Sequence, residues 1–420
     1  VLSARSPLRN TPTTKTYALF VNDRLPDDAI KTSYTTELRN QFGAEVLRVP
    51  FTSASSINNW VKDKTFGLIS DLLDDEMLAP KGGPEQTFAL VNALAIDMEW
   101  VNKIQPLRED YSVYFSYINY SSYINPFELT GFTKQPFDNS TIDVNSLRIA
   151  ATIHKYNLLN ELGVDNIRQI ITDEYTQWLG TEDAKICAEY RDEPFPSTDE
   201  YADDYLEVLG NGGYETVKSS TDFSFYDDSE IKIFAKDLKT YDGITLQYIG
   251  IMPKSTSLQD YIKTLNSDKL ATTIGHLKPI ALDSFPDGVI TDITGNIPVF
   301  KFQDKLDLVG ALQGLGITDV FSESLANLSN LSNNPTGLYI GNAVHQATVD
   351  FSNDGIKASA ATALVGGYGA GGDCLYYHTF DVPVEKIDLT FSEPYLFLIR
   401  DKDSGTIWFV GTVYQPTLYK

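Results

Sequence analysis

The chain has 420 residues, of which 42% are hydrophobic and 21% charged, and it carries a formal net charge of −24 at pH 7. A chain of this length can bury a large core, and no apolar run approaches the roughly 18 residues that a membrane span needs. The negative charge disfavours nucleic acid and anionic membrane surfaces as partners. Two cysteines are too few for a disulfide-rich protein or for a zinc site with four thiolates.

Patterns typical of strands and helices alternate up to residue 100. Residues 1–16 are polar and contain prolines, so we expect a disordered end, and any signal peptide has been removed or was not included. We expect Asp27 and Asp28 to cap a helix that ends near Phe42, where Gly43 suits the C-cap. The other elements predicted here are strands over 16–21 and 44–51 and a helix over 56–73.

Residues 101–221 differ in character from the rest of the chain. Tyrosines recur at every third position over 111–123. They either form a recognition surface or pack an added strand against the body of the protein. A helix is predicted over 149–162 with Gly163 as its stop, and a second helix over 165–179. Two such neighbours form an αα-hairpin, so we expect an inserted helical and tyrosine-rich subdomain.

Two strands are predicted beyond this insertion, over 231–238 and 244–252. Tyr241, Asp242 and Gly243 lie between them and suit a tight turn, so the pair is expected to form a β-hairpin. The sequence contains neither an internal repeat nor a low-complexity tract.

The stretch over residues 338–374 is the most distinctive. It begins as a predicted strand over 339–351, continues as an alanine-rich run over 355–365, and ends in glycines over 366–372. Alternate positions of the alanine-rich run are apolar or small, as a strand that fills a narrow slot requires, whereas its other residues suit exposure to solvent. We interpret this run as a bistable element that can be either a solvent loop or a central strand.

Residues 367–372 also satisfy the G-x-G-x-x-G spacing of a dinucleotide loop. Such a loop needs a helix after it, but residues 373–382 are tyrosine-rich and are followed by Pro383, which indicates extended chain. We therefore expect no dinucleotide or other cofactor. The four histidines have no metal-ligand spacing, and no serine or cysteine lies in a nucleophile-elbow motif, so we expect the protein not to be an enzyme.

Several stretches resemble the serpins, and the best of them is 344–347 (VHQA) followed by 351–355 (FSNDG) and the alanine-rich run. They are similar to the fifth strand of sheet A and the hinge of that family. Further similar stretches are 57–67, 88–100, 315–321 and 394–416. The chain thus resembles a bacterial-type serpin with a large insertion.

The fold that this resemblance implies is a single α+β domain over 1–420, with a large central mixed sheet A, smaller sheets and surrounding helices. The first four helices of the family are not seen in this chain, so we expect a fragment or a replaced core. The resemblance covers residues 17–100 and 222–420. Residues 355–383 are expected to form the exposed reactive loop of a metastable fold.

The function implied is inhibition of serine-type endopeptidases as a suicide substrate, in which the cleaved loop inserts into sheet A. The spacing between hinge glycine and reactive bond in inhibitory serpins, counted from Gly355, places the bond at Gly369–Ala370, with Tyr368–Gly369 as the alternative. A small residue at the bond suggests elastase- or subtilisin-like targets, whereas Tyr368 suggests chymotrypsin-like ones. The hinge residues implied are Gly355, Ile356, Lys357, Ala358, Ser359, Ala360, Ala361 and Thr362.

Two pairs of residues gain roles from the resemblance. In serpins the histidine that matches His345 hydrogen-bonds across the opening of sheet A, and Asn92 lies where its partner would be. We expect these two residues to form a latch at the shutter of the sheet. A disulfide between Cys187 and Cys374 would hold the insertion beside the far end of the loop, and two unpaired cysteines are the alternative.

A non-inhibitory serpin-like protein that binds a ligand or acts at the cell surface is the second hypothesis. It is favoured by the insertion and by Ile356, a bulky residue where the family usually has a small hydroxyl residue. In either case we expect a monomer that is extracellular or at the cell surface.

Overall fold

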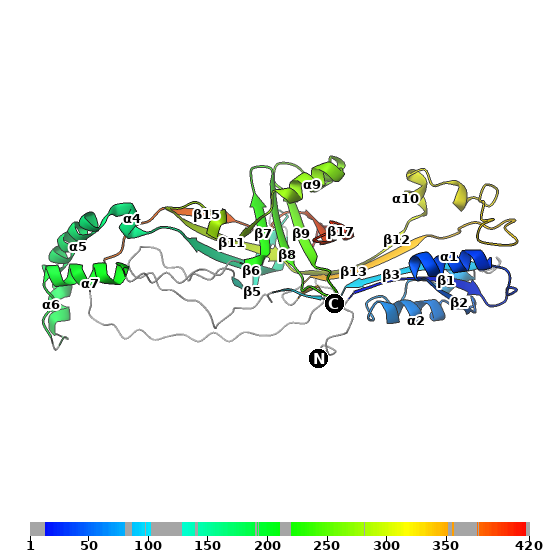
Figure 1. Cartoon of the computed structure of the whole chain (residues 1–420), viewed down its shortest axis with the longest axis horizontal. Helices are drawn as coiled ribbons and strands as arrows, with labels where there is room; N and C mark the ends of the chain where they lie inside the picture. The colour runs from blue at the N-terminus through cyan, green and yellow to red at the C-terminus, as the bar shows by residue number, and fades with distance from the viewer. Residues whose placement is uncertain are drawn as a thin grey trace. The chain divides into compact units, whose positions relative to one another are not determined.

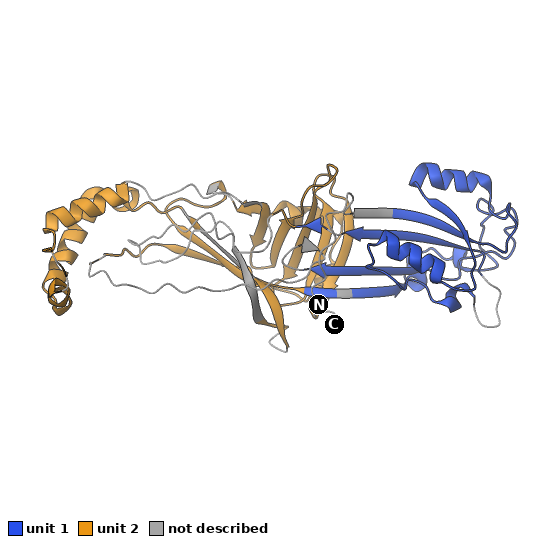
Figure 2. Cartoon of the chain, turned by 90° about the horizontal axis from the view of Figure 1, so that it is seen from below, with its two compact units in different colours: residues 1–99, 300–359, 417–420 blue, residues 100–299, 360–416 orange. Residues whose placement is uncertain are grey.

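The computed structural model describes residues 13–79, 86–96, 98–101, 128–138, 142–189, 191, 193–210, 220–280, 282–351, 355–356, 376 and 378–416. The chain divides into two compact units, one of residues 1–99, 300–359 and 417–420 and the other of residues 100–299 and 360–416 (Figure 2). None of the helices in the described ranges is long and apolar enough to cross a membrane.

The first unit contains a sheet of three strands, and residues of α1 and α2 pack against opposite faces of its strand β1 (Figure 1). Its order is β2-β1-β3, with β1 parallel to β2 and antiparallel to β3. Successive side chains of β1 point to opposite faces, so Leu19 packs with Leu38 of α1 while Phe20 packs with Trp60 of α2. The elements are β1 (Thr13–Asn22), β2 (Glu45–Val49), β3 (Phe88–Ile96), α1 (Thr32–Phe42) and α2 (Ser55–Lys64).

A second sheet of the same unit has the order β12-β13-β14-β4. Strands β12 and β13 pair antiparallel along their whole length. The short strand β14 lies between β13 and β4 and is antiparallel to both. The strands are β12 (Phe300–Asp307), β13 (Val344–Phe351), β14 (Gly355–Ile356) and β4 (Met98–Glu99).

The second unit is built on a sheet of six strands in the order β10-β7-β8-β9-β16-β17. Strand β9 is buried along its whole length and β8 along nearly all of it. The predicted hairpin is confirmed, because β8 and β9 pair antiparallel and Asp242 (φ 48°) and Gly243 (φ 78°) make the turn. The strands are β7 (Ser220–Asp227), β8 (Ile231–Asp237), β9 (Leu246–Pro253), β10 (Lys278–Ile280), β16 (Tyr395–Asp401) and β17 (Ile407–Val413).

The second unit also holds a sheet of four strands, β15-β11-β6-β5, and a group of helices in which α5 packs against α6 and α7 (Figure 1). The strands are β5 (Glu128–Phe137), β6 (Ile142–His154), β11 (Ile290–Pro298) and β15 (Val384–Asp388). The helices are α4 (Leu158–Leu162), α5 (Val164–Leu179), α6 (Glu182–Glu189) and α7 (Thr198–Gly210). Shorter elements elsewhere are α3 (Asp75–Leu78), α8 (Leu258–Lys263), α9 (Ser267–Gly275) and α10 (Val309–Gly314).

Three sequence-based expectations need correction. Asp27 and Asp28 do not cap α1, which begins at Thr32 after an N-cap residue without a side-chain bond. The helix predicted over 56–73 ends at Lys64, because Gly67 has φ 79° and the Thr65 hydroxyl donates back to the Val61 carbonyl at 2.7 Å. The helix predicted over 149–162 is wrong over its first part, because β6 continues to His154 in antiparallel pairing with β11.

Candidate functional site

Most of the predicted reactive loop lies outside the described residues. Both alternatives of the reactive bond and most of the hinge are among these residues. The structure describes only the two ends of the predicted loop, where it joins the rest of the protein. The predicted residues outside the described ranges are Lys357, Ala358, Ser359, Ala360, Ala361, Thr362, Tyr368, Gly369, Ala370 and Cys374.

The N-terminal attachment of the loop is β14. Ile356 lies opposite Phe351 of β13 on one side and opposite Met98 of β4 on the other, and Gly355 lies opposite Glu99. Both pairings are antiparallel, so the chain leaves Ile356 in the direction that runs back along β13. The first two hinge residues are therefore already a strand between two other strands.

Strand β13, beside this attachment, buries polar side chains. Asp350 forms an ion pair of 3.0 Å with Lys301, and Gln346 Nε2 donates to Asp71 Oδ1 at 3.4 Å. The Gln346 Oε1 and Thr348 Oγ1 atoms are buried, and no described residue offers them a hydrogen bond. A buried polar group without a partner costs about 1–3 kcal/mol, so each of these two oxygens lowers the stability of the fold around β13.

The two residues of the predicted latch lie on different sheets of the first unit. Asn92 is on β3 opposite Tyr17, and His345 is on β13 opposite Leu306. Both side chains are exposed, and no hydrogen bond joins them among the contacts of the described residues. The latch stays a prediction.

The C-terminal attachment of the loop begins at Tyr376, on the helices of the second unit. The Tyr201 hydroxyl donates to the Tyr376 carbonyl at 2.8 Å, and the Tyr205 hydroxyl donates to the His378 carbonyl at 2.8 Å. Both donors come from α7, four residues apart. The two hydroxyls of α7 thus bind the chain through its backbone carbonyls.

Aromatic rings surround the same stretch of chain. The ring of Tyr376 stacks on Trp178 of α5, with centroids 5.3 Å apart, and lies 5.9 Å from Tyr175 and 6.0 Å from Tyr201. Tyr175 and Tyr201 stack on each other at 4.0 Å, which joins α5 to α7. Burial raises the pKa of the Tyr376 and Tyr175 hydroxyls above the usual value.

Two further residues complete this attachment. Phe380 is buried in the core formed with α5 and α7, and its ring lies 6.4 Å from that of Tyr205. The imidazole of His378 packs edge-on against Phe380 at 4.5 Å. Burial lowers the pKa of His378, and the nearby charge of Glu174 opposes this shift.

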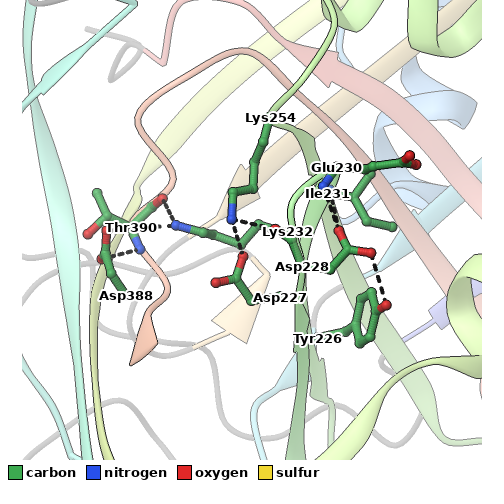
Figure 3. Close-up of polar contacts among 9 residues, drawn as sticks. All are labelled: Tyr226, Asp227, Asp228, Glu230, Ile231, Lys232, Lys254, Asp388 and Thr390. Carbon is green, nitrogen blue, oxygen red and sulfur yellow. Dashed lines mark hydrogen bonds and ion pairs between the residues drawn. The ribbon is translucent and has the colours of Figure 1, made fainter. Parts of the chain in front are cut away.

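Beyond Phe380 the chain joins the sheets of the second unit. The Ile290 amide donates to the Pro383 carbonyl at 3.0 Å, and β15 then pairs in parallel with β11. At the end of β15, the Lys232 ammonium group donates to the Thr390 carbonyl at 3.1 Å and lies 3.8 Å from a carboxylate oxygen of Asp388 (Figure 3). This strand is therefore tied at both of its ends.

Lys232 is a buried cation. Its side chain is only 7% exposed, and burial lowers its pKa, with the charge of Asp388 acting in the opposite direction. Figure 3 shows the neighbouring pair of Lys254 with Asp227, whose atoms are 2.9 Å apart. The amine of Lys232 needs the Thr390 carbonyl, because a buried charge without a hydrogen-bond partner is strongly destabilising.

Cys187 lies on α6, directly after the helix that carries Tyr175 and Trp178. Cys374 is outside the described residues, but Tyr376, two residues further along the chain, contacts α5 and α7. The predicted disulfide remains a prediction.

The contacts of Tyr201 and Tyr205 were not predicted from the sequence. The available signal was a pair of tyrosines four residues apart in a segment with helical periodicity, which is equally typical of an ordinary buried helix face. In the described ranges, no group of three histidine, cysteine or acidic side chains could hold a metal ion.

Comparison with known proteins agrees with these features. A family model described as serpin (serine protease inhibitor) matches residues 7–124 and 213–416. The chain is 28% identical over 187 residues to serine protease inhibitor 88Ea of Drosophila melanogaster, which covers 44% of this chain and 38% of that protein. It is 25% identical over 385 residues to Iripin-3 of Ixodes ricinus, which covers 90% of this chain and 68% of that protein.

Solved structures show the same fold. Native protease nexin-1 matches with a TM-score of 0.55 at 17% identity, over 96% of this chain and 77% of that one. The family model leaves residues 125–212 unmatched, and α5, α6 and α7 lie in that part of the chain. Because the family model matches most of the chain and the solved serpins share its α+β fold, this chain belongs to the serpin family.

Proposed function

We propose that this protein inhibits serine-type endopeptidases as a suicide substrate. The serine oxygen of the target attacks the carbonyl carbon of Gly369, an ester forms, and Ala370 leaves with the new amino group. The freed segment then enters the sheet of the first unit between β13 and β4, carrying the attached protease with it. About fifteen residues at roughly 3.3 Å each would move the protease some 50 Å before the ester is hydrolysed.

The observation that carries this proposal is the position of β14. Its residues already lie between the two strands that an inserting segment would join. If the registers of Ile356 with Phe351 and with Met98 continue without a bulge, Thr362 comes opposite both His345 and Asn92. The two residues of the predicted latch would then flank the inserted strand.

The residues of the alanine-rich run suit this movement. Alanine and serine lose little side-chain entropy on insertion, and the run over 355–365 contains no proline to interrupt a strand. Insertion would also supply β13 with a full-length neighbour. The unsatisfied Gln346 and Thr348 oxygens support a native state that is less stable than the inserted one.

A ligand-binding or cell-surface protein without inhibitory activity is the second candidate. The helices that the family model leaves unmatched favour it, because inhibition by insertion does not require them. Ile356 also favours it, since a bulky residue at the start of the hinge slows insertion. In both cases we propose a monomer that acts outside the cell or at its surface.

Incubation of the full chain with elastase, subtilisin and chymotrypsin tests the proposal. We expect a complex with at least one protease that survives SDS and, after reduction, a released C-terminal peptide that begins at Ala370 by mass spectrometry. A peptide that begins at Gly369 would select the alternative bond. Cleavage of the loop by every protease without an SDS-resistant complex would reject inhibition and favour the second candidate.

A further inference from the structure

The spacing of Tyr201 and Tyr205 along α7 is close to the spacing of alternate residues in an extended chain. Four residues of α-helix rise about 6 Å, and two residues of extended chain span about 6.6 Å. Tyr201 and Tyr205 are four apart, and the carbonyls that they bind, of Tyr376 and His378, are two apart. One face of α7 therefore binds two backbone carbonyls whose spacing in the sequence suits an extended chain.

Side chains fix this segment at each end. At its beginning, the Tyr376 ring lies among Trp178, Tyr175 and Tyr201. At its other end, Phe380 is 7% exposed in a core with Tyr205. Release of the segment would expose these rings and leave two tyrosine hydroxyls without their acceptors.

We propose that Tyr175, Trp178, Tyr201 and Tyr205 form an aromatic clamp that holds residues 376–380 and sets the C-terminal limit of the segment that proteases can cut. A protease binds its substrate as an extended chain and needs the backbone carbonyls on both sides of the bond. In the clamped segment two carbonyls are already bound and Phe380 is buried. This role deepens the proposed function, since it confines cleavage to the loop before Tyr376.

The sequence explains why such a limit is needed. Leu375, Tyr376, Tyr377 and Phe380 are residues after which chymotrypsin-like proteases cut. A cut there would give a freed segment that is longer than the space between β13 and β4. Insertion would then be incomplete, and the attached protease would not be moved along the whole sheet. Helices α5 and α7, which the family model does not match, would therefore position the chain that follows the reactive loop.

Limited digestion of the full chain with chymotrypsin, mapped by mass spectrometry, tests the clamp. The test variant is Tyr201→Phe/Tyr205→Phe, which keeps both rings and removes both hydroxyls. The matched control is Tyr226→Phe, outside the clamp, which removes a hydroxyl that donates to an Asp228 carboxylate oxygen at 2.9 Å instead. Each lost bond is expected to favour release about fivefold, so cuts after Tyr376, Tyr377 and Phe380 should be roughly 25-fold faster in the double variant.

The wild type and the control should be cut at these three positions equally slowly. Equal rates in the wild type and the double variant would overturn the proposal, as would a control that is cut as fast as the double variant. Hydrogen exchange of residues 376–383 gives a second measurement, with the single variant Tyr201→Phe expected to show about fivefold faster exchange if the double variant does not fold. Neither measurement requires a trapped protease, so a missing SDS-resistant complex would reject the proposed inhibition and leave the clamp standing.

Discussion

Ile356 lies opposite Phe351 in antiparallel register, so β14 runs in the direction opposite to β13. On its other side Ile356 lies directly opposite Met98 of β4. The first two residues of the predicted hinge, Gly355 and Ile356, are therefore already a strand, and their pairing fixes the direction of β14. This relationship gives the hinge a direction, and the first prediction rests on it.

Ala360→Glu should convert the protein from an inhibitor into a substrate. In the continued register Ala360 comes opposite the half-buried Ala347 and Leu94, and a carboxylate between these apolar side chains loses hydration without gaining a partner. Inhibition is a race between insertion and hydrolysis, so slower insertion yields cleaved protein and free protease. The ratio of complex to cleaved product on SDS gels measures this. Gly372→Glu, which adds the same charge beyond the reactive bond, is the control, and equal trapping by wild type and Ala360→Glu would contradict insertion.

Lys232→Met should destabilise the second unit by about 1–3 kcal/mol, because the Thr390 carbonyl loses its donor at 3.1 Å. Asp388→Asn should change stability by less than about 1 kcal/mol, since its carboxylate is 68% exposed and 3.8 Å from the ammonium group. Urea denaturation of the two variants gives both values. The account is wrong if the aspartate variant is the less stable of the two.

Gly295→Ala should lower the stability of the second unit more than Lys232→Met does. A Cβ atom at Gly295 would lie 2.5 Å from the backbone carbon of Leu389, where the chain after β15 runs beside β11. The Leu389 amide also donates to the Thr294 carbonyl at 2.6 Å, so the backbone has no room to withdraw. Gly310→Ala, with open space at the same atom, is the control and should be neutral or stabilising. Thermal unfolding of both variants compares them.

Acid should loosen the clamp through His378. Burial lowers the pKa of this imidazole in the folded protein, while the unfolded chain has a value near 6.5. Below about pH 6.5 the unfolded state therefore binds the proton more readily, and the stability of the clamp falls as the pH drops. Hydrogen exchange of residues 376–383, corrected for intrinsic rates, should rise between pH 7.5 and 5.5 in the wild type. His378→Gln should remove this rise, and an imidazole that titrates above 6.5 by NMR would contradict the prediction.

The two cysteines should be bonded in the oxidised protein. Alkylation of the denatured, non-reduced chain should then leave Cys187 and Cys374 unmodified, and reduction should expose both. Loss of the bond in Cys187→Ser is expected to cost about 2–4 kcal/mol, because it closes a long loop of the unfolded chain. Alkylation of both thiols without reduction would reject the disulfide.

Local patterns were sufficient for several elements of this fold. The hairpin of β8 and β9 followed from two apolar runs and the turn at Asp242 and Gly243, and Gly43 was correctly identified as the C-cap of α1, where it has φ 61°. Helix α5 was placed to within one residue. In each case the decisive interactions lie within a few residues of one another in the chain.

Tertiary contacts decided what local patterns could not. Residues 149–154 have helical periodicity but form part of β6, because the backbone hydrogen bonds to β11 outweigh a weak local preference for helix. The clamp depends on residues as distant as Tyr201 and Tyr376, which are 175 positions apart. The sequence by itself determined the family and the antiparallel hairpin of β8 and β9. Only the tertiary structure decided that β14 lies between β13 and β4 and that α7 holds the chain after the loop, since both depend on which distant backbone groups meet.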